Sequence, residues 1–201
     1  MDCEQAGRAA EQQFGLPQGL LLAIGHVESG RWDAAVGRVV ASPWAVDVDG
    51  DGKRFSNSND AISATRAAQA AGRRSIDVGC FQISLLHHPD AFADLDRAFD
   101  PQANAQYAAR FLASLQARLG NWQDATAAYH SATPELGLPY RDRVFAAWSG
   151  TPPISTIGVT EFPAFPGIRV WSPVPAGTAP EVIGIHAASS QSLPHVITPD
   201  R

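Results

Sequence analysis

The sequence has little of what a nucleic-acid-binding or membrane-spanning protein needs. Its 201 residues carry 15 Lys and Arg against 20 Asp and Glu, for a net charge of −5, and Lys53 is the single lysine. The basic residues form no run, which argues against nucleic acid and against an anionic membrane surface as partners. No stretch of 18 apolar residues is present, so no membrane span is predicted. The N-terminus also lacks the charged and apolar regions of a signal peptide, so the protein is either cytoplasmic or has lost a leader.

Strand-like β-branched runs are scarce before residue 150, whereas Ala-rich runs are common. We therefore predict a mainly α domain over residues 1–150, a size that buries about 70% of the surface exposed by the unfolded chain. Residues 151–201 hold nine of the fifteen prolines, few charges and no helical periodicity, which predicts an extended or disordered tail. An apolar cluster at 162–171 indicates that this tail docks on the domain or binds a partner.

The domain is predicted to be arranged around one helix, in the stretch LPQGLLLAIGHVESG. Pro17 suits the first turn of this helix, and the apolar residues from Leu20 to Val27 recur at three- and four-residue spacing. Glu28 would lie in its last turn, beside hydrophobic surface and at the negative end of the helix dipole. Both effects penalise a charged carboxylate and raise its pKa, as a general acid requires. A solvated glutamate at a helix end is the alternative.

A small β-hairpin is predicted over residues 42–55, where apolar and polar residues alternate on both sides of a Gly-rich turn. Its turn also resembles the opening of a calcium-binding loop, but the twelfth position is Ser58 instead of a glutamate. We therefore favour a hairpin turn and predict no metal. The residues that would open the calcium loop are Asp47, Asp49, Asp51 and Gly52.

Helical periodicity, capping residues and glycine stops predict the other elements. The predicted helices span residues 2–14, 58 or 59 to 71, 89–99, 101–119, 124–131 and 140–148. The segment SIDVGCFQIS, residues 75–84, is short and interrupted by a glycine, so it is predicted as a buried turn instead of a regular element.

Three short motifs follow one another in the chain: Glu28-Ser29-Gly30, Gly79-Cys80-Phe81-Gln82-Ile83 and Ala128-Tyr129-His130. In this order they resemble the soluble lytic transglycosylase (SLT, family 1) catalytic domain, whose usual motifs are E-S, G-L-M-Q and A-Y-N. The resemblance covers roughly residues 3–149. It implies a lysozyme-like fold that cleaves the glycan strands of peptidoglycan, with a small hairpin insertion and no cofactor.

The chain departs from the family pattern in three places. Cys80-Phe81 replaces Leu-Met, His130 replaces Asn, and about fifty residues separate Glu28 from the second motif. The long gap resembles the insertion in the specialised branch that is associated with secretion systems or the flagellum. This implies a periplasmic protein whose tail contacts flagellar rod or secretion-system proteins.

Glycoside cleavage ordinarily uses two carboxylates, but here no second acid lies in a matching motif. Asp47, Asp49 and Asp51 fall in the predicted hairpin tip, and Asp77 precedes the Gly79 turn. The resemblance therefore implies that Glu28 acts alone, while the 2-acetamido group of N-acetylmuramic acid attacks the anomeric carbon. Glu28 would then deprotonate the 6-hydroxyl group, which closes a 1,6-anhydro ring.

The resemblance also assigns the neighbouring residues. Ser29 would orient Glu28 or the acetamido group, Gln82 would bind sugar amides, and Tyr129 would hold the Glu28 carboxyl. The remaining substrate-binding residues are Phe81 and Ile83, which would wall the site, and His130.

Two cysteines, Cys3 and Cys80, are predicted to form a disulfide because a cell-wall enzyme acts in an oxidising compartment. Nucleophilic roles for Cys80 and Ser29 are disfavoured, because neither residue has a matching base or motif. Two other functions stay open, a hydrolytic muramidase that uses the same Glu28 and a non-catalytic peptidoglycan-binding scaffold.

Overall fold

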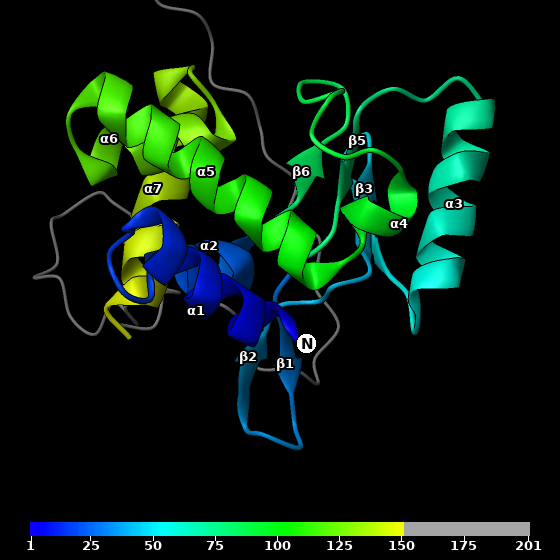
Figure 1. The fold of residues 1–201 in the computed structure, drawn as a ribbon, viewed down its shortest axis with the longest axis horizontal. Coiled ribbons are helices and arrows are strands. Elements are labelled where there is room, and N and C mark those ends of the chain that lie inside the picture. Colours follow the sequence, from blue (N-terminus) through cyan, green and yellow to red (C-terminus); the bar gives the residue numbers. More distant parts are fainter. Residues whose placement is uncertain (151–201) are drawn as a thin grey trace, which may run out of the picture. The chain divides into compact units, whose positions relative to one another are not determined.

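The structure, a computed structural model, describes residues 1–150 (Figure 1). The predicted tail, residues 151–201, with its apolar cluster, lies outside the described residues. Within the described part the protein is mainly helical, as predicted. The helices are α1 (Cys3–Phe14), α2 (Leu20–Glu28), α3 (Ser58–Ala70), α4 (Leu95–Ala98), α5 (Pro101–Leu119), α6 (Trp122–His130) and α7 (Pro134–Trp148). The strands are β1 (Arg31–Asp33), β2 (Arg38–Val40), β3 (Ala45–Val48), β4 (Asp51–Arg54), β5 (Ile76–Val78) and β6 (Ile83–Ser84).

The elements form two packed groups around two apolar clusters. Helices α1, α2, α5, α6 and α7 pack together, and Leu20, Leu21 and Ile24 of α2 are completely buried among them. Helices α3 and α4 pack with an antiparallel sheet of strand order β4-β3-β5-β6. Figure 1 shows this sheet and α3 to the right of α1, α2 and α7, and the β1–β2 hairpin projecting below them.

Helix α2 begins later than predicted. Pro17 lies before the helix, and the backbone enters it through Gly19, which has a φ of 86°. The start of the helix is capped from α1, because the carboxylate of Glu11 accepts hydrogen bonds from the backbone N–H groups of Gly19, Leu21 and Leu22. A negative charge at a helix N-terminus also complements the helix dipole. Because Glu11 caps it, α2 does not need a proline in its first turn.

The hairpin predicted at 42–55 is confirmed as β3 and β4. The segment 75–84, predicted as a turn without regular structure, instead forms two short strands around a tight turn at 79–82. Strand β5 pairs with β3, which supplies the hydrogen bonds that the short segment lacks alone. Ile76 and Val78 are both buried in the core, so the segment has the two-residue periodicity of a strand.

Helix α7 begins at Pro134, six residues before its predicted start, and it contains Pro139. A proline inside a helix removes a backbone hydrogen-bond donor. Packing of α7 against α2 and α6 offsets this loss. The short helix predicted at 89–99 is reduced to α4.

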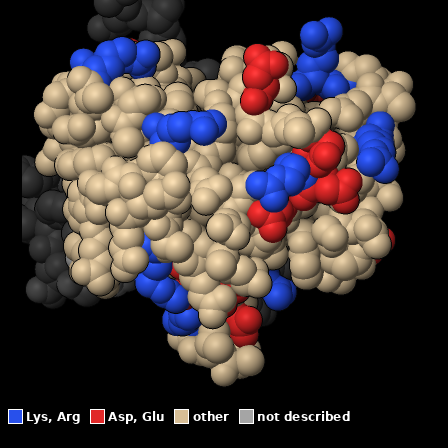
Figure 2. Space-filling model, viewed as in Figure 1, with Lys and Arg blue, Asp and Glu red and all other residues tan. Residues whose placement is uncertain are grey.

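No helix in the described part is both long and apolar enough to span a membrane. On the face shown in Figure 2, acidic and basic side chains are interspersed among uncharged residues.

Candidate active site

A cavity of about 770 Å³ lies between the sheet and the helices α5 and α6. The sheet side contributes Asp47, Asp77, Gln82 and Ile83, and the helical side contributes Phe111, Tyr129 and His130. Glu28 reaches the cavity from the end of α2. The structure therefore brings residues of all three sequence motifs to one cavity.

Glu28 is the last residue of α2, and burial raises its pKa to about 7. Smaller contributions come from Asp77 and Asp47, which raise the pKa further, and from Tyr140 and Arg143, which lower it. The predicted direction of the shift is confirmed, and burial is its main cause. A carboxyl group with a pKa near neutrality both donates and accepts a proton, which suits it to act in turn as general acid and general base.

The tyrosine beside Glu28 is Tyr140 on α7. The Tyr140 hydroxyl lowers the pKa of Glu28. This hydroxyl makes no hydrogen bond of standard geometry within residues 1–150, to Glu28 or to any other residue. The Tyr140 ring is buried and stacks on the ring of His130, with 4.6 Å between ring centroids. A buried tyrosine hydroxyl without a fixed partner has its proton available for the Glu28 carboxyl.

Tyr129, which we predicted to hold the Glu28 carboxyl, donates its hydroxyl proton to the carbonyl oxygen of Phe81 at 2.9 Å. A phenol has one proton to donate, so in this structure the Tyr129 hydroxyl can bond to the Glu28 carboxyl only as an acceptor. Tyr129 does line the cavity, where its ring lies 5.5 Å from that of Phe111. The motif places Tyr129 at the site, and its hold on the Glu28 carboxyl stays a prediction.

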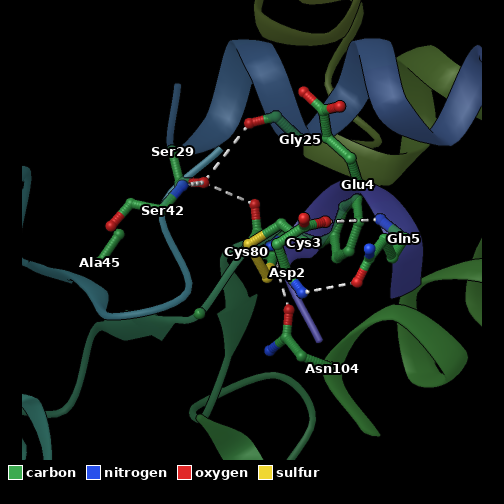
Figure 3. The surroundings of a disulfide bond; sticks show 12 residues. Asp2, Cys3, Glu4, Gln5, Gly25, Ser29, Ser42, Ala45, Cys80 and Asn104 are labelled. Atoms are coloured by element: carbon green, nitrogen blue, oxygen red, sulfur yellow. Dashed lines mark hydrogen bonds between the residues drawn. A yellow bond between two sulfur atoms is a disulfide. The ribbon is translucent and has the colours of Figure 1, made fainter. Parts of the chain in front are cut away.

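Ser29 is completely buried and does not line the cavity. Its hydroxyl donates to the carbonyl oxygen of Cys80 at 2.7 Å and accepts from the backbone N–H of Ser42 at 3.0 Å (Figure 3). This geometry contradicts a direct contact with substrate. Ser29 instead joins the end of α2 to the turn of the second motif.

Arg54 on β4 also holds the end of α2. Its guanidinium donates to the carbonyl oxygens of Ser29 and Gly30, at 3.0 Å and 2.9 Å. A positive group at a helix C-terminus satisfies carbonyls that lack helical partners and complements the dipole. A side chain at Gly30 has no room, because its Cβ would lie 2.1 Å from the carbonyl oxygen of His26.

The turn of the second motif is held by Asn104, a buried residue of α5. Its side-chain oxygen accepts from the N–H of Phe81, and its amide donates to the carbonyls of Val78 and Ala98. Gly79 has a φ of 84°, and a Cβ there would lie 2.4 Å from Asn104. Sequence reasoning missed Asn104, because it lies on the helical stripe of α5 among apolar residues.

Gln82 faces the cavity from this turn, with a φ of 47°. Its side-chain nitrogen donates to the carbonyl oxygens of Gly79 and Ala45, at 2.9 Å and 3.2 Å. These two bonds occupy both amide protons, so the side-chain oxygen is the atom left to meet a ligand.

Ile83 lines the cavity, but Phe81 does not. The Phe81 ring is buried in the helical core and lies so close to Gly25 that a Cβ there would approach within 2.9 Å. The prediction that Phe81 walls the site is therefore wrong in this structure. The turn directs successive side chains to opposite sides, so Gln82 faces the cavity while Phe81 faces the core.

The predicted disulfide between Cys3 and Cys80 is present, with Cα atoms 5.7 Å apart (Figure 3). It ties the start of α1 to the second motif across 77 residues. Cys80 is therefore no thiol nucleophile in this structure.

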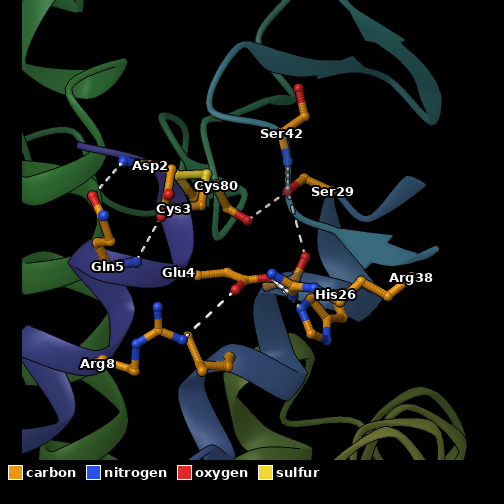
Figure 4. A network of polar contacts seen from close by, with 12 residues as sticks. Asp2, Cys3, Glu4, Gln5, Arg8, His26, Ser29, Arg38, Ser42 and Cys80 are labelled. Atoms are coloured by element: carbon orange, nitrogen blue, oxygen red, sulfur yellow. Dashed lines mark hydrogen bonds and ion pairs between the residues drawn. A yellow bond between two sulfur atoms is a disulfide. The ribbon is translucent and has the colours of Figure 1, made fainter. Parts of the chain in front are cut away.

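A polar network that sequence reasoning missed lies beside the disulfide (Figure 4). The Glu4 carboxylate bonds to Arg38 and lies 3.6 Å from Arg8 and 3.5 Å from His26. The bond to Arg38 is the main reason that the pKa of Glu4 is lowered. Glu4 thus holds α1, α2 and the β1–β2 hairpin together.

Two acids that the sequence did not place in the site, Asp47 and Asp77, line the cavity with Glu28. They lie directly opposite each other on β3 and β5. Burial raises the pKa of Asp77, as does Asp47, whereas Ser84 and His87 lower it. A signal was present, since each aspartate lies between two β-branched apolar residues and must face away from the core.

The calcium alternative finds no support in the described residues. The hairpin acids are each bonded within the protein, Asp47 to the Gly50 N–H at 2.7 Å, Asp49 to Arg73, and Asp51 to Lys53 at 2.9 Å. Residues 1–150 contain no group of three or more His, Cys, Asp or Glu side chains arranged to hold a metal ion.

Comparison with curated proteins gave no match, and comparison with solved structures gave none either. A family model, the Transglycosylase SLT domain, matches residues 5–137. The match covers α1 through the first turn of α7 and includes all three motifs, the disulfide residue Cys80 and the cavity. The chain therefore belongs to the Transglycosylase SLT domain family.

Proposed function

We propose that this protein cleaves the β-1,4 bond between N-acetylmuramic acid and N-acetylglucosamine without water and leaves 1,6-anhydro ends. The family comprises lytic transglycosylases that act on peptidoglycan. The observation that carries the proposal for this chain is Glu28, buried at the end of α2, facing the cavity and with a pKa of about 7.

Glu28 would first give its proton to the glycosidic oxygen while the acetamido carbonyl oxygen bonds to the anomeric carbon. The bond between that carbon and the glycosidic oxygen breaks, and its electron pair stays on the leaving oxygen. Glu28, now a carboxylate, then takes the proton of the 6-hydroxyl group as that oxygen displaces the acetamido oxygen. The buried setting of Glu28 favours both steps, because it makes the neutral and charged forms close in free energy.

The surrounding residues support binding of a sugar chain. Gln82 offers its side-chain oxygen to sugar amide or hydroxyl donors, as the resemblance implied. Ile83, Tyr129 and His130 provide apolar and aromatic surface on both sides of the cavity. Ser29 and Phe81 act behind these residues, by holding the end of α2 and the second motif.

Digestion of purified sacculi tests the proposal. Mass spectrometry of the released muropeptides should show 1,6-anhydro ends with the native protein and none with Glu28→Gln. Reducing ends would identify a hydrolytic muramidase instead. Binding to sacculi without any release of fragments would identify a scaffold.

We further propose that the protein acts in the periplasm and opens the cell wall for an envelope-spanning machine, a flagellum or a secretion system. The insertion between Glu28 and the second motif, which folds into β1 to β4 and α3, supports this proposal. Removing residues 151–201 from the chain in its own cells tests the role of the tail. Loss of motility or secretion with normal wall-cleaving activity is the expected outcome, and an unaffected machine would contradict it.

A further inference from the structure

The fixed charges that line the cavity are negative, although His87 also lines it and lowers the pKa of Asp77. Three carboxyl groups line it, from Glu28, Asp47 and Asp77, and no Lys or Arg is among the described residues that line it. Neither aspartate forms an ion pair with a Lys or Arg among residues 1–150, whereas Asp49 and Asp51 on the same hairpin do. The cavity therefore suits a ligand that carries or develops positive charge.

The two aspartates are also placed at a cost to stability. Asp47 and Asp77 occupy directly opposed positions on β3 and β5, so their side chains leave the sheet on the same face. Like charges directly opposite each other in a sheet are destabilising. The opposite face of these strands carries Val46 and Val78, which are buried in the core. The unfavourable pair is thus confined to the surface that faces the cavity.

We propose that Asp77 is a second catalytic residue, whose carboxylate accepts a hydrogen bond from the N–H of the substrate acetamido group and stabilises the positive charge of the cyclic intermediate. Asp47 adds negative charge from the opposite strand. This inference rests on the proposed function, since it requires the acetamido group to be the nucleophile. When the acetamido oxygen bonds to the anomeric carbon, the positive charge is shared with the acetamido nitrogen, and its N–H becomes a stronger donor.

Asp77 gains and loses no proton in this scheme. The proton that cleaves the glycosidic bond comes from Glu28, and the proton of the 6-hydroxyl group returns to Glu28. Asp77 contributes only electrostatic stabilisation, which is strongest when the intermediate forms. Replacing it must therefore lower the rate without changing the products.

The same two aspartates help to keep Glu28 protonated before the reaction. The titratable groups that are electrostatically coupled to Glu28 are Asp47 on β3, Asp77 on β5, Tyr129 on α6, and Tyr140 and Arg143 on α7. Neutralising Asp77 should lower the pKa of Glu28 and move the loss of activity at high pH toward lower pH. A purely structural role for Asp77 would leave this limb of the pH profile in place.

Three variants test the proposal: Asp77→Asn, Asp47→Asn and the matched control Asp51→Asn, which lies on the neighbouring strand and outside the cavity. Loss of one stabilising group in a buried site lowers kcat by about 10²–10³-fold, so we expect about 100-fold for Asp77→Asn, with KM changed by less than about threefold. We expect a smaller loss, about tenfold, for Asp47→Asn and none for the control. Both cavity variants should melt at the same temperature as the native protein or higher, because a repulsion is removed.

Binding of a thiazoline analogue of the cyclic intermediate gives a readout without turnover. Calorimetry with the Glu28→Gln protein and with the Glu28→Gln, Asp77→Asn double variant should show at least about tenfold weaker binding to the latter. Equal binding, or a kcat for Asp77→Asn within threefold of the control, would overturn the assignment. The assignment would also be overturned if the native protein released fragments with reducing ends and the Asp77→Asn variant did not, since Asp77 would then activate water. A native protein that releases no fragments at all overturns the proposed function itself.

Discussion

The hydroxyl of Ser29 donates a 2.7 Å hydrogen bond to the carbonyl oxygen of Cys80, and it thereby joins two motifs that are 51 residues apart in the chain. The same hydroxyl accepts the N–H of Ser42 at 3.0 Å, so one side chain satisfies two backbone groups. Because the site is fully buried, water does not replace either bond. The end of α2, and with it Glu28, is therefore held against the turn of the second motif.

Replacing Ser29 with Ala should destabilise the protein by about 1–3 kcal/mol, because it leaves a buried carbonyl and a buried N–H without partners. Activity should fall as well, since the end of α2 is released from the turn. Urea unfolding measures the first effect and a sacculus assay the second. Ser114→Ala is the control, because the Ser114 hydroxyl is exposed and bonds only locally, to the carbonyl of Phe111. Equal stability of the two variants would contradict the assignment.

Glu28→Gln should lower activity by about 10²–10⁴-fold, the usual share of general acid catalysis. It should also stabilise the fold at high pH. The folded-state pKa of Glu28, about 7, lies above its ordinary value of 4.5. The native protein therefore loses stability as pH rises between these values, by up to about 3 kcal/mol. Thermal melting at pH 4 and pH 8 checks this, with the exposed Glu135→Gln as control. A difference in melting temperature between Glu28→Gln and the native protein that is the same at both pH values would refute this prediction.

Tyr140→Phe should raise the pKa of Glu28 further, because the Tyr140 hydroxyl lowers it. The loss of activity at high pH, where Glu28 gives up its proton, should then move to higher pH. Stability should change little, since this hydroxyl has no hydrogen bond of standard geometry within residues 1–150. The comparison is Tyr129→Phe, which removes the bond to Phe81 and should cost about 1 kcal/mol. An unchanged pH profile for Tyr140→Phe would show that the hydroxyl does not act on Glu28.

Reduction of the Cys3–Cys80 disulfide should lower stability by about 4 kcal/mol on the chain-entropy model, because the bridge closes a long loop. Denaturant unfolding with and without reductant measures the change, and a Cys3→Ala, Cys80→Ala protein is the control that no reductant affects. Intact-mass analysis after alkylation without reductant should find no labelled thiol. Two labelled thiols in the folded protein would contradict the bridge.

The sequence predicts the parts of the site that depend on local pattern. Glu28 follows from the apolar periodicity of its helix, which determines both where the helix ends and how buried its last turn is. The β3–β4 hairpin follows from alternation around a Gly-rich turn. The disulfide follows from the family resemblance, which places Cys80 in an extracytoplasmic enzyme.

Contacts between distant segments were not predictable in the same way. Tyr140 reaches Glu28 only because α7 packs across α2, and nothing near Tyr140 in the sequence indicates this. Asn104 holds the second motif from 23 residues away. Asp77 was set aside because it lies in no matching motif and precedes the Gly79 turn, and its three-residue strand gains its partner only from β3. In each case the missing information is which elements lie side by side.

Arg54 belongs to the strand next to β3, yet its guanidinium bonds the last carbonyls of the helix that carries Glu28. The position of the hairpin and the position of the acid are therefore mechanically linked. A displacement of the hairpin must either break these two hydrogen bonds or pull the end of α2 with it. Arg54 thus couples β4 to Glu28 from outside the cavity.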